Sequence, residues 1–394
     1  TALDQTIRIW SKEGDPWRVL QLSGEIRRLG FSPNQPQSIV TAGNGITAQL
    51  RQWETPLLKT IFLDGNSWDV AISPNGERII GGDSSQINVW DTNRNTIATL
   101  EAEQDTLLGF DFSPDGQLIA AAGRSGTIRL WTQAGRFLRT LEGHQLQTWD
   151  VAFSPDGQRV AAGAEDGTIR IWTVDGQLLH TLSGHEGRVY RVAFSPDGQQ
   201  LVSSGADGTV QIWDQDGALR HRLEAHDSDI FGLSVSPDGQ FFATASVDQT
   251  VKLWRWDGTL VRTFEGHSHN VYGVDFSADG QLLATASADN TVNLWTLDGE
   301  KLKTLYGNGS GFKSVKFSST GKLLVTVAEN GTLTLWSLDT ILALNELSYA
   351  CDWIQDYLTT NVDVLARDRT ICDGVPPLAP KLNHGQLLPN WRQS

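Results

Sequence analysis

Residues 194–214 read "FSPDGQQLVSSGADGTVQIWD", and closely similar stretches occur on both sides of them. Residues 153–173 read "FSPDGQRVAAGAEDGTIRIWT", and residues 276–296 read "FSADGQLLATASADNTVNLWT". A tryptophan stands near the end of each copy and recurs along the chain, at Trp10, Trp53, Trp90, Trp131, Trp172, Trp213, Trp254, Trp295 and Trp336. From Trp90 onward these tryptophans are 41 residues apart. A period near 40 predicts a fold built by stacking copies of one unit.

Within one period the hydrophobic pattern alternates, as it does in a β-strand. In "VYRVAFSPDG" (189–198), Val192 and Phe194 alternate with Arg191 and Ala193, and the runs "QQLVSS", "TVQIW" and "ALRHRL" follow. Pro-Asp-Gly and Ala-Asp-Gly separate the runs and supply turn residues that tolerate positive φ. Four short antiparallel strands therefore form each unit. Such a sheet has two apolar faces, so the units must stack, and closure into a ring limits the number of exposed edges.

Several features that recur together resemble those of the WD-repeat family. They are the period, the terminal Trp, the Asp-containing turn and the pairs Gly143–His144, Gly184–His185 and Gly266–His267, with Ala225–His226 as a variant. The resemblance covers roughly residues 1–338. It implies an all-β fold, a β-propeller of four-stranded blades.

The strand count favours eight blades, with seven as the alternative. For eight, "RVLQL" at 18–22 completes the set that ends at Trp336 and so joins the two ends of the array. For seven, the ring begins near residue 57, and residues 1–55 are the remnant of an upstream propeller. Residues 339–394 are predicted to form a C-terminal helical and irregular extension, in which "ILALNELSYACDWIQDYL" (341–358) has the spacing of an amphipathic helix.

Each well-kept repeat holds His, Ser or Thr, Asp and Trp at fixed offsets. The three sets are His185, Asp207 and Trp213 with Ser203 or Ser204; His226, Asp248 and Trp254 with Thr244 or Ser246; and His267, Asp289 and Trp295 with Thr285 or Ser287. A buried indole N–H needs an acceptor, and a hydroxyl can pass the bond to an imidazole that donates to a carboxylate. In the WD-repeat family this network is a structural clamp within the blade.

A catalytic role for these sets is disfavoured, because a nucleophile also needs an oxyanion site and a substrate cleft. The two imidazoles of "HSH" (267–269) have no Cys, Asp or Glu at ligand spacing, which argues against zinc. We therefore predict no catalytic residue, no metal and no cofactor.

The repeats differ most in one column at the entry of the first strand. It contains Trp68, Trp149, Tyr190, Phe231, Tyr272 and Lys313, and Arg191 stands in the next column. First strands line the channel of a propeller, and in the WD-repeat family this rim is often the contact surface for peptides and ligands. Aromatic residues and Arg are also enriched at binding hot spots. We expect these seven residues to bind a partner; the alternative is that the aromatics pack between blades.

Composition narrows the choice of partner. The net charge of −15 and the pI near 4.9 disfavour nucleic acid and anionic membrane surfaces. The two cysteines, Cys351 and Cys372, are too few for a disulfide scaffold, and no secretion signal opens the chain. A cytoplasmic protein is expected, with these thiols reduced rather than paired. The absence of any Met leads us to expect upstream domains in the full-length protein.

Together these features predict a non-catalytic scaffold that binds a protein or peptide. The tail resembles the ends of large bacterial, especially cyanobacterial, WD-repeat proteins, which implies the sensor module of a bacterial signalling protein. Two alternatives are a purely structural or oligomeric array and an enzyme with its site at the channel mouth.

Overall fold

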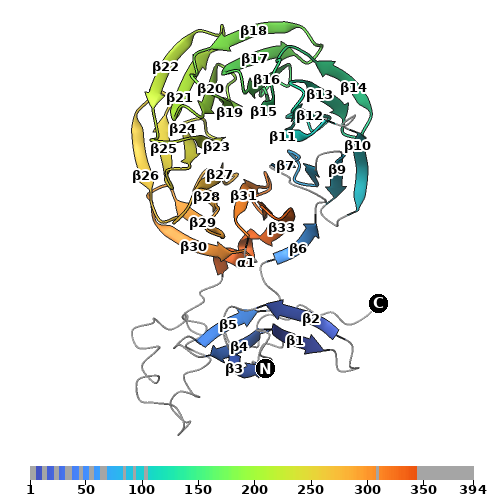
Figure 1. Cartoon of the computed structure of the whole chain (residues 1–394), viewed down its shortest axis with the longest axis vertical. Coiled ribbons are helices and arrows are strands. Elements are labelled where there is room, and N and C mark those ends of the chain that lie inside the picture. The colour runs from blue at the N-terminus through green and yellow to red at the C-terminus, as the bar shows by residue number, and fades with distance from the viewer. Residues whose placement is uncertain are drawn as a thin grey trace, which may run out of the picture. The chain divides into compact units, whose positions relative to one another are not determined.

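Each complete repeat folds into one antiparallel sheet of four strands, and seven such sheets form a ring (Figure 1). The computed structural model describes residues 69–82, 86–91, 95–101, 105–307 and 310–343, together with the backbone of the strands that precede residue 63. The chain divides into two compact units. One is Leu57–Ile341, which holds the ring, and the other combines Thr1–Pro56 with Leu342–Ser394.

The seven blades are numbered in chain order. Blade 1 has β7 (Ala71–Ile72), β8 (Arg78–Gly82), β9 (Gln86–Asp91) and β10 (Thr96–Glu101). Blade 2 has β11 (Leu107–Phe112), β12 (Leu118–Gly123), β13 (Ile128–Thr132) and β14 (Phe137–Leu141). Blade 3 has β15 (Thr148–Phe153), β16 (Arg159–Ala164), β17 (Thr168–Thr173) and β18 (Leu178–Ser183). Blade 4 has β19 (Val189–Phe194), β20 (Gln200–Gly205), β21 (Thr209–Asp214) and β22 (Leu219–Glu224). Blade 5 has β23 (Ile230–Val235), β24 (Phe241–Ser246), β25 (Val251–Arg255) and β26 (Leu260–Phe264). Blade 6 has β27 (Val271–Phe276), β28 (Leu282–Ser287), β29 (Thr291–Thr296) and β30 (Lys301–Tyr306). Blade 7 has β31 (Phe312–Phe317), β32 (Leu323–Ala328), β33 (Thr332–Ser337) and β6 (Leu57–Phe62).

The Ser-Pro-Asp-Gly turns fix the hairpin between the first two strands of a blade. In blade 4 the Ser195 hydroxyl donates to Asp197 Oδ1 at 2.5 Å and accepts from the backbone N–H of Gln200 at 2.9 Å. Gly198 closes the turn at φ +69°, a conformation that side chains disfavour. The motif quoted from the sequence is therefore a local turn device that sets the strand register.

The ring is closed by β6, the first strand of the unit Leu57–Ile341. β6 pairs antiparallel with β33, and Leu57 lies opposite Trp336 just as Leu219 lies opposite Trp213 in blade 4. The ring thus has seven blades, and the favoured count of eight is wrong. The segment predicted at 18–22 does not complete the last blade, because its residues 18–21 lie in β2 (Pro16–Gln21), which pairs with β1 (Thr6–Trp10). The remaining strands, β3 (Ile26–Phe31), β4 (Ser38–Gly43) and β5 (Ala48–Gln52), form a sheet of three.

The hydrophobic core lies in the seams between neighbouring blades. Between blades 2 and 3, for example, Ile128 and Leu130 pack with Val151, Val160 and Trp172, all of them buried. Similar clusters fill the other seams, and the short helix α1 (Leu338–Ala343) adds Leu338 and Ile341 to the cluster of blades 6 and 7. A single blade could not bury these faces, so its stability depends on its neighbours.

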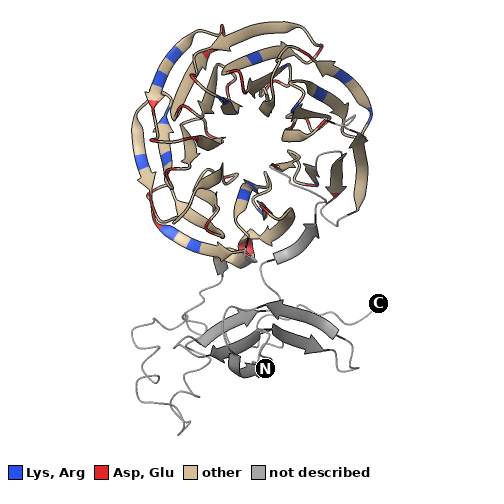
Figure 2. Cartoon of the chain, in the orientation of Figure 1, with Lys and Arg blue, Asp and Glu red and all other residues tan. Residues whose placement is uncertain are grey.

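Lys and Arg lie largely on the outer strands of the ring, whereas many Asp and Glu residues lie in turns (Figure 2). Among the described residues, no helix has the length and apolar character needed to cross a membrane. Of the helix predicted over 341–358, only residues 341–343 are among the described residues. Both cysteines lie outside them. The proposals that residues 1–55 are a propeller remnant and that 339–394 form an extension stay predictions.

Candidate functional site

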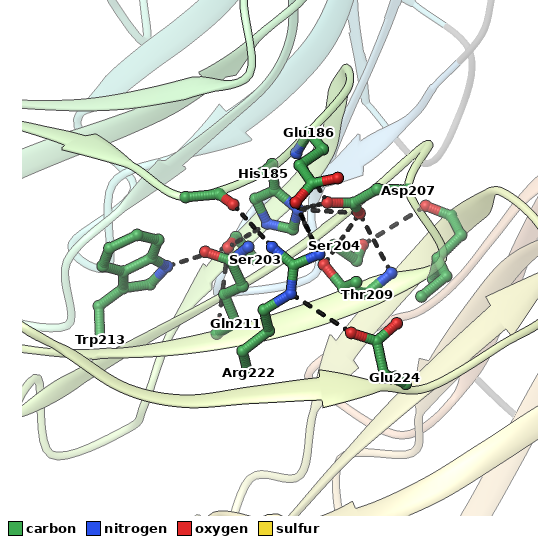
Figure 3. Close-up of polar contacts among 12 residues, drawn as sticks. His185, Glu186, Ser203, Ser204, Asp207, Thr209, Gln211, Trp213, Arg222 and Glu224 are labelled. Atoms are coloured by element: carbon green, nitrogen blue, oxygen red, sulfur yellow. Dashed lines mark hydrogen bonds and ion pairs between the residues drawn. The ribbon is translucent and has the colours of Figure 1, made fainter.

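The nine residues predicted as clamps form three sets, one each in blades 4, 5 and 6. In blade 4, His185 Nδ1 lies 3.1 Å from both carboxylate oxygens of Asp207 (Figure 3). Its Nε2 lies 2.9 Å from Ser203 Oγ, and the same oxygen accepts the indole N–H of Trp213 at 3.0 Å. The sequence left Ser203 and Ser204 as alternatives, and Ser203 is the residue that joins the two rings.

The hydrogen bonds of this set run in one consistent direction. Asp207 is a carboxylate and can only accept, so His185 donates to it from Nδ1, which leaves Nε2 directed at the Ser203 hydroxyl. Burial alone would raise the pKa of Asp207, but hydrogen bonds from His185, Glu186 N–H and Thr209 hold it well below its usual range. Both ring nitrogens of His185 therefore have hydrogen-bond partners within the set.

Blade 5 repeats this geometry. His226 lies 2.8 Å from Asp248 Oδ2 and 2.8 Å from Thr244 Oγ1, which accepts from Trp254 at 3.0 Å. Burial lowers the pKa of His226, and the attraction of Asp248 offsets this only in part. Thr244 rather than Ser246 is the linking hydroxyl.

Blade 6 has the same arrangement. His267 lies 2.9 Å from Asp289 Oδ2 and 2.7 Å from Thr285 Oγ1, which accepts from Trp295 at 2.9 Å. Burial is also the main cause that lowers the pKa of His267.

In two blades that lack part of the His–hydroxyl–Asp set, the indole N–H of the repeated tryptophan still has an acceptor. In blade 3 Trp172 donates to the backbone carbonyl of Glu142 at 3.2 Å, because alanine stands where a hydroxyl would be. In blade 7 Trp336 donates to Thr326 at 2.9 Å without a histidine. The tryptophan N–H is thus satisfied in each case, as a buried donor requires.

Four of the predicted partner-binding residues lie side by side at one mouth of the channel. Trp149, Tyr190, Phe231 and Tyr272, each the second residue of an innermost strand, form what we call the aromatic arc. Trp149 and Tyr190 meet edge to face at 5.2 Å, and Tyr190 stacks on Phe231 at 4.2 Å. Phe231 and Tyr272 meet edge to face at 5.4 Å. Four successive blades are therefore joined by one continuous series of aromatic contacts.

The members of the arc differ in exposure. Tyr190 is only 5 % exposed, and its hydroxyl donates to Asp229 at 2.9 Å, whereas the other three are partly exposed. Burial and Asp229 raise the pKa of Tyr190 to about 12, so it stays a donor at neutral pH. Asn270 donates to the Tyr272 hydroxyl at 3.1 Å. The interpretation as interblade packing thus applies best to Tyr190, which lies at the centre of the arc.

The remaining predicted contact residues are placed differently. Lys313 is 7 % exposed, and burial lowers its pKa against the opposing attraction of Glu329. Trp68 lies outside the described residues.

Arg191 points into the channel and reaches across it. Its Nη1 lies 3.0 Å from Asp69 of blade 1 and 3.2 Å from Asp150 of blade 3, and its Nε donates to the carbonyl of Phe231 at 3.0 Å. Ser314 of blade 7 also donates to Asp69, at 3.0 Å. This network lies directly under the aromatic arc and connects blades that are far apart in the ring.

A cavity of about 310 Å³ occupies the channel, and further charged groups line it. Asp111, Asp275 and Lys316 stand two residues beyond the column that contains Arg191. Lys316 Nζ lies 3.7 Å from Asp275 Oδ1. The sequence analysis did not identify Asp111, Asp275 and Lys316 as channel residues. Each stands three residues after a position of the aromatic column, so their shared spacing was visible in the sequence. Within the described part of the chain, no group of three or more His, Cys, Asp or Glu could hold a metal ion.

Comparison with known proteins agrees with this architecture. Seven stretches match the family described as "WD domain, G-beta repeat", at residues 58–91, 94–132, 135–173, 176–214, 217–255, 258–296 and 299–337. No curated protein sequence matches the chain. The first stretch begins inside β6, so the family match and the strand that closes the ring agree on where the seven repeats start.

Proposed function

The chain belongs to the WD-repeat family, and we propose that it is a non-catalytic propeller that binds a protein or peptide at the channel mouth bearing the aromatic arc. The unbroken series of ring contacts from Trp149 through Tyr190 and Phe231 to Tyr272 carries this proposal. Interfaces of this kind use aromatic anchors at their centre. Function is also more often located where repeats differ than where they agree.

The clamps support the non-catalytic part of the proposal. In each complete set the imidazole, hydroxyl and carboxylate already satisfy one another, and the hydroxyl also accepts from a buried tryptophan. Ser203 and Thr244 are also fully buried, so a substrate cannot reach their hydroxyls. The sets therefore contribute to folding.

The wider setting belongs to the same proposal. We place the chain in the cytoplasm of a bacterium, as the recognition module of a larger signalling protein. Its partner is a protein or peptide rather than nucleic acid or a membrane, since the net charge is −15.

A peptide-display selection against the full chain tests the proposal. Enriched peptides are then measured by calorimetry against Phe231→Ala and Tyr272→Ala, with Phe137→Ala as the matched control. Phe137 is 51 % exposed on the outer strand β14, far from the arc. Loss of a hot-spot aromatic weakens binding about tenfold or more, and the control changes it by less than about twofold. Equal binding by all three variants, or failure to enrich any peptide, would contradict the proposal.

A further inference from the structure

Carboxylates on the channel wall join neighbouring blades. Asp111 Oδ2 of blade 2 accepts the backbone N–H of Phe153 in blade 3 at 2.7 Å. Asp275 of blade 6 accepts from Phe317 in blade 7 at 2.8 Å in the same way. Each of these bonds crosses a seam at the inner edge of the ring, where the first strands of two blades run side by side.

The two carboxylates differ in their charge partners. Asp275 has Lys316 at 3.7 Å, and Arg191 is already bound between Asp69 and Asp150. Among the described residues, Asp111 has no cation within 4.0 Å. Among the described residues that line the cavity, the cations Arg191 and Lys316 both lie against other carboxylates, so Asp111 holds its seam with no cation in direct contact.

The groups that face Asp111 come from the strands around the channel. Asp150 on β15 repels its charged form, and Lys316 on β31 attracts it more weakly. Arg191, Asp69 and Asp275 also line the cavity, but Arg191 acts chiefly on Asp69 and Asp150, and Asp275 acts chiefly on Lys316. The backbone N–H groups of Phe112 and Phe153 favour the charged form. Burial outweighs these hydrogen bonds and raises the pKa of Asp111 to about 7.

We propose that the seam between blades 2 and 3 is a proton-dependent closure, which holds most firmly when Asp111 is neutral and loosens when its carboxylate ionises. The hydrogen bond to Phe153 survives in both forms, because a neutral carboxyl group still has a carbonyl oxygen that accepts. What changes is the presence of a negative charge that has no cation in direct contact and that is repelled by Asp150 on the next blade. Acidification thus tightens this seam, whereas acid weakens most contacts of carboxylates in proteins.

The sign and the pH range follow from linkage. In the closed seam Asp111 titrates at about 7, and in an open, solvated seam it titrates near its ordinary value of 3.8. Between these two values the closed form binds more protons, so the closed-to-open ratio falls as pH rises, by up to about tenfold per pH unit. Above pH 7 the loss is complete, at up to about a thousandfold.

Hydrogen exchange of the Phe153 amide in the full chain tests the proposal, together with Asp111→Asn, which keeps an acceptor oxygen of the same size. The opening constant, corrected for the intrinsic exchange rate at each pH, should rise at least about tenfold from pH 5 to pH 7.5 in the wild type. It should stay flat in Asp111→Asn. Asp115→Asn is the matched control, since Asp115 lies exposed in the following turn and hydrogen bonds lower its pKa; it should behave as the wild type does.

A second measurement does not depend on any variant being folded. A carboxyl-carbon NMR titration of aspartate-labelled wild type should contain one resonance with a midpoint between about 6 and 8 that belongs to Asp111. A midpoint below about 5 would overturn the proposal. So would an opening constant at Phe153 with the same pH dependence in wild type and Asp111→Asn.

Discussion

Replacing Thr244 with valine tests whether the clamps stabilise the blades. Thr244 is fully buried, and its hydroxyl is the single link between the indole of Trp254 and the imidazole of His226. Valine has nearly the same shape, so the substitution removes the hydrogen bonds and leaves little change in volume. Two groups then lose their partners, the Trp254 N–H and His226 Nε2.

The expected loss follows from these two groups. A buried polar group left without a partner costs about 1–3 kcal/mol, so the loss of two partners should lower the free energy of unfolding by about 2–6 kcal/mol. The matched control is Thr263→Val in β26 of the same blade, where the side chain is partly exposed. Substitutions at such positions usually change stability by less than about 0.5 kcal/mol.

Denaturant unfolding of the full chain, followed by circular dichroism, measures both variants. Trp254→Phe completes a double-mutant cycle with Thr244→Val. Because the two single changes break the same bond, the double variant should be more stable than additivity predicts, by at least about 1 kcal/mol. If Thr244→Val changes stability no more than Thr263→Val does, the clamp does not stabilise the blade and the reasoning is refuted.

Three further predictions follow from other contacts. Arg191→Met leaves two channel carboxylates without their cation and should cost about 3–5 kcal/mol in denaturant unfolding; a loss under about 1 kcal/mol would contradict the cross-channel tie. Gln211 is fully buried, and neither its Oε1 nor its Nε2 has a hydrogen-bond partner, so Gln211→Leu should leave the melting temperature unchanged or raise it; a clear drop would count against this. Burial lowers the pKa of His226 below 6.5 in the folded chain, so the unfolded chain binds the proton more readily and stability is lost as pH falls below about 6.5. The stability advantage of wild type over His226→Gln should therefore shrink between pH 7.5 and pH 5, and a constant or growing advantage would argue against a neutral imidazole.

The repeat period was sufficient to predict the blades and the clamps, because both depend on residues close in sequence. In blade 4 the choice between Ser203 and Ser204 follows from strand alternation, whereas in blades 5 and 6 the two candidates are two residues apart, face the same side and cannot be separated in this way. Leu201 lies opposite Trp213, and Ser203, two residues further, faces the same side as Leu201, whereas Ser204 faces the neighbouring blade. This signal was available in the sequence.

The blade number and the channel network could not be predicted in the same way. Ring closure pairs β6 with β33, two strands at opposite ends of the array. In the sequence, the segment 18–22 and the segment of β6 are similar short runs, and either could have supplied the closing strand. The contact between Arg191 and Asp69 joins blades 4 and 1 across the channel. No period relates these two residues, so Arg191, predicted to contact a partner, could not be recognised as a cross-channel link.

The most direct test of the binding account is a hydrogen-exchange footprint of the full chain with and without its best display-selected peptide. The account predicts protection at the starts of the innermost strands of blades 3 to 6, around Trp149, Tyr190, Phe231 and Tyr272. Protection confined to the outer strands, or to the Ser-Pro-Asp-Gly turns at the other ends of the innermost strands, would contradict it.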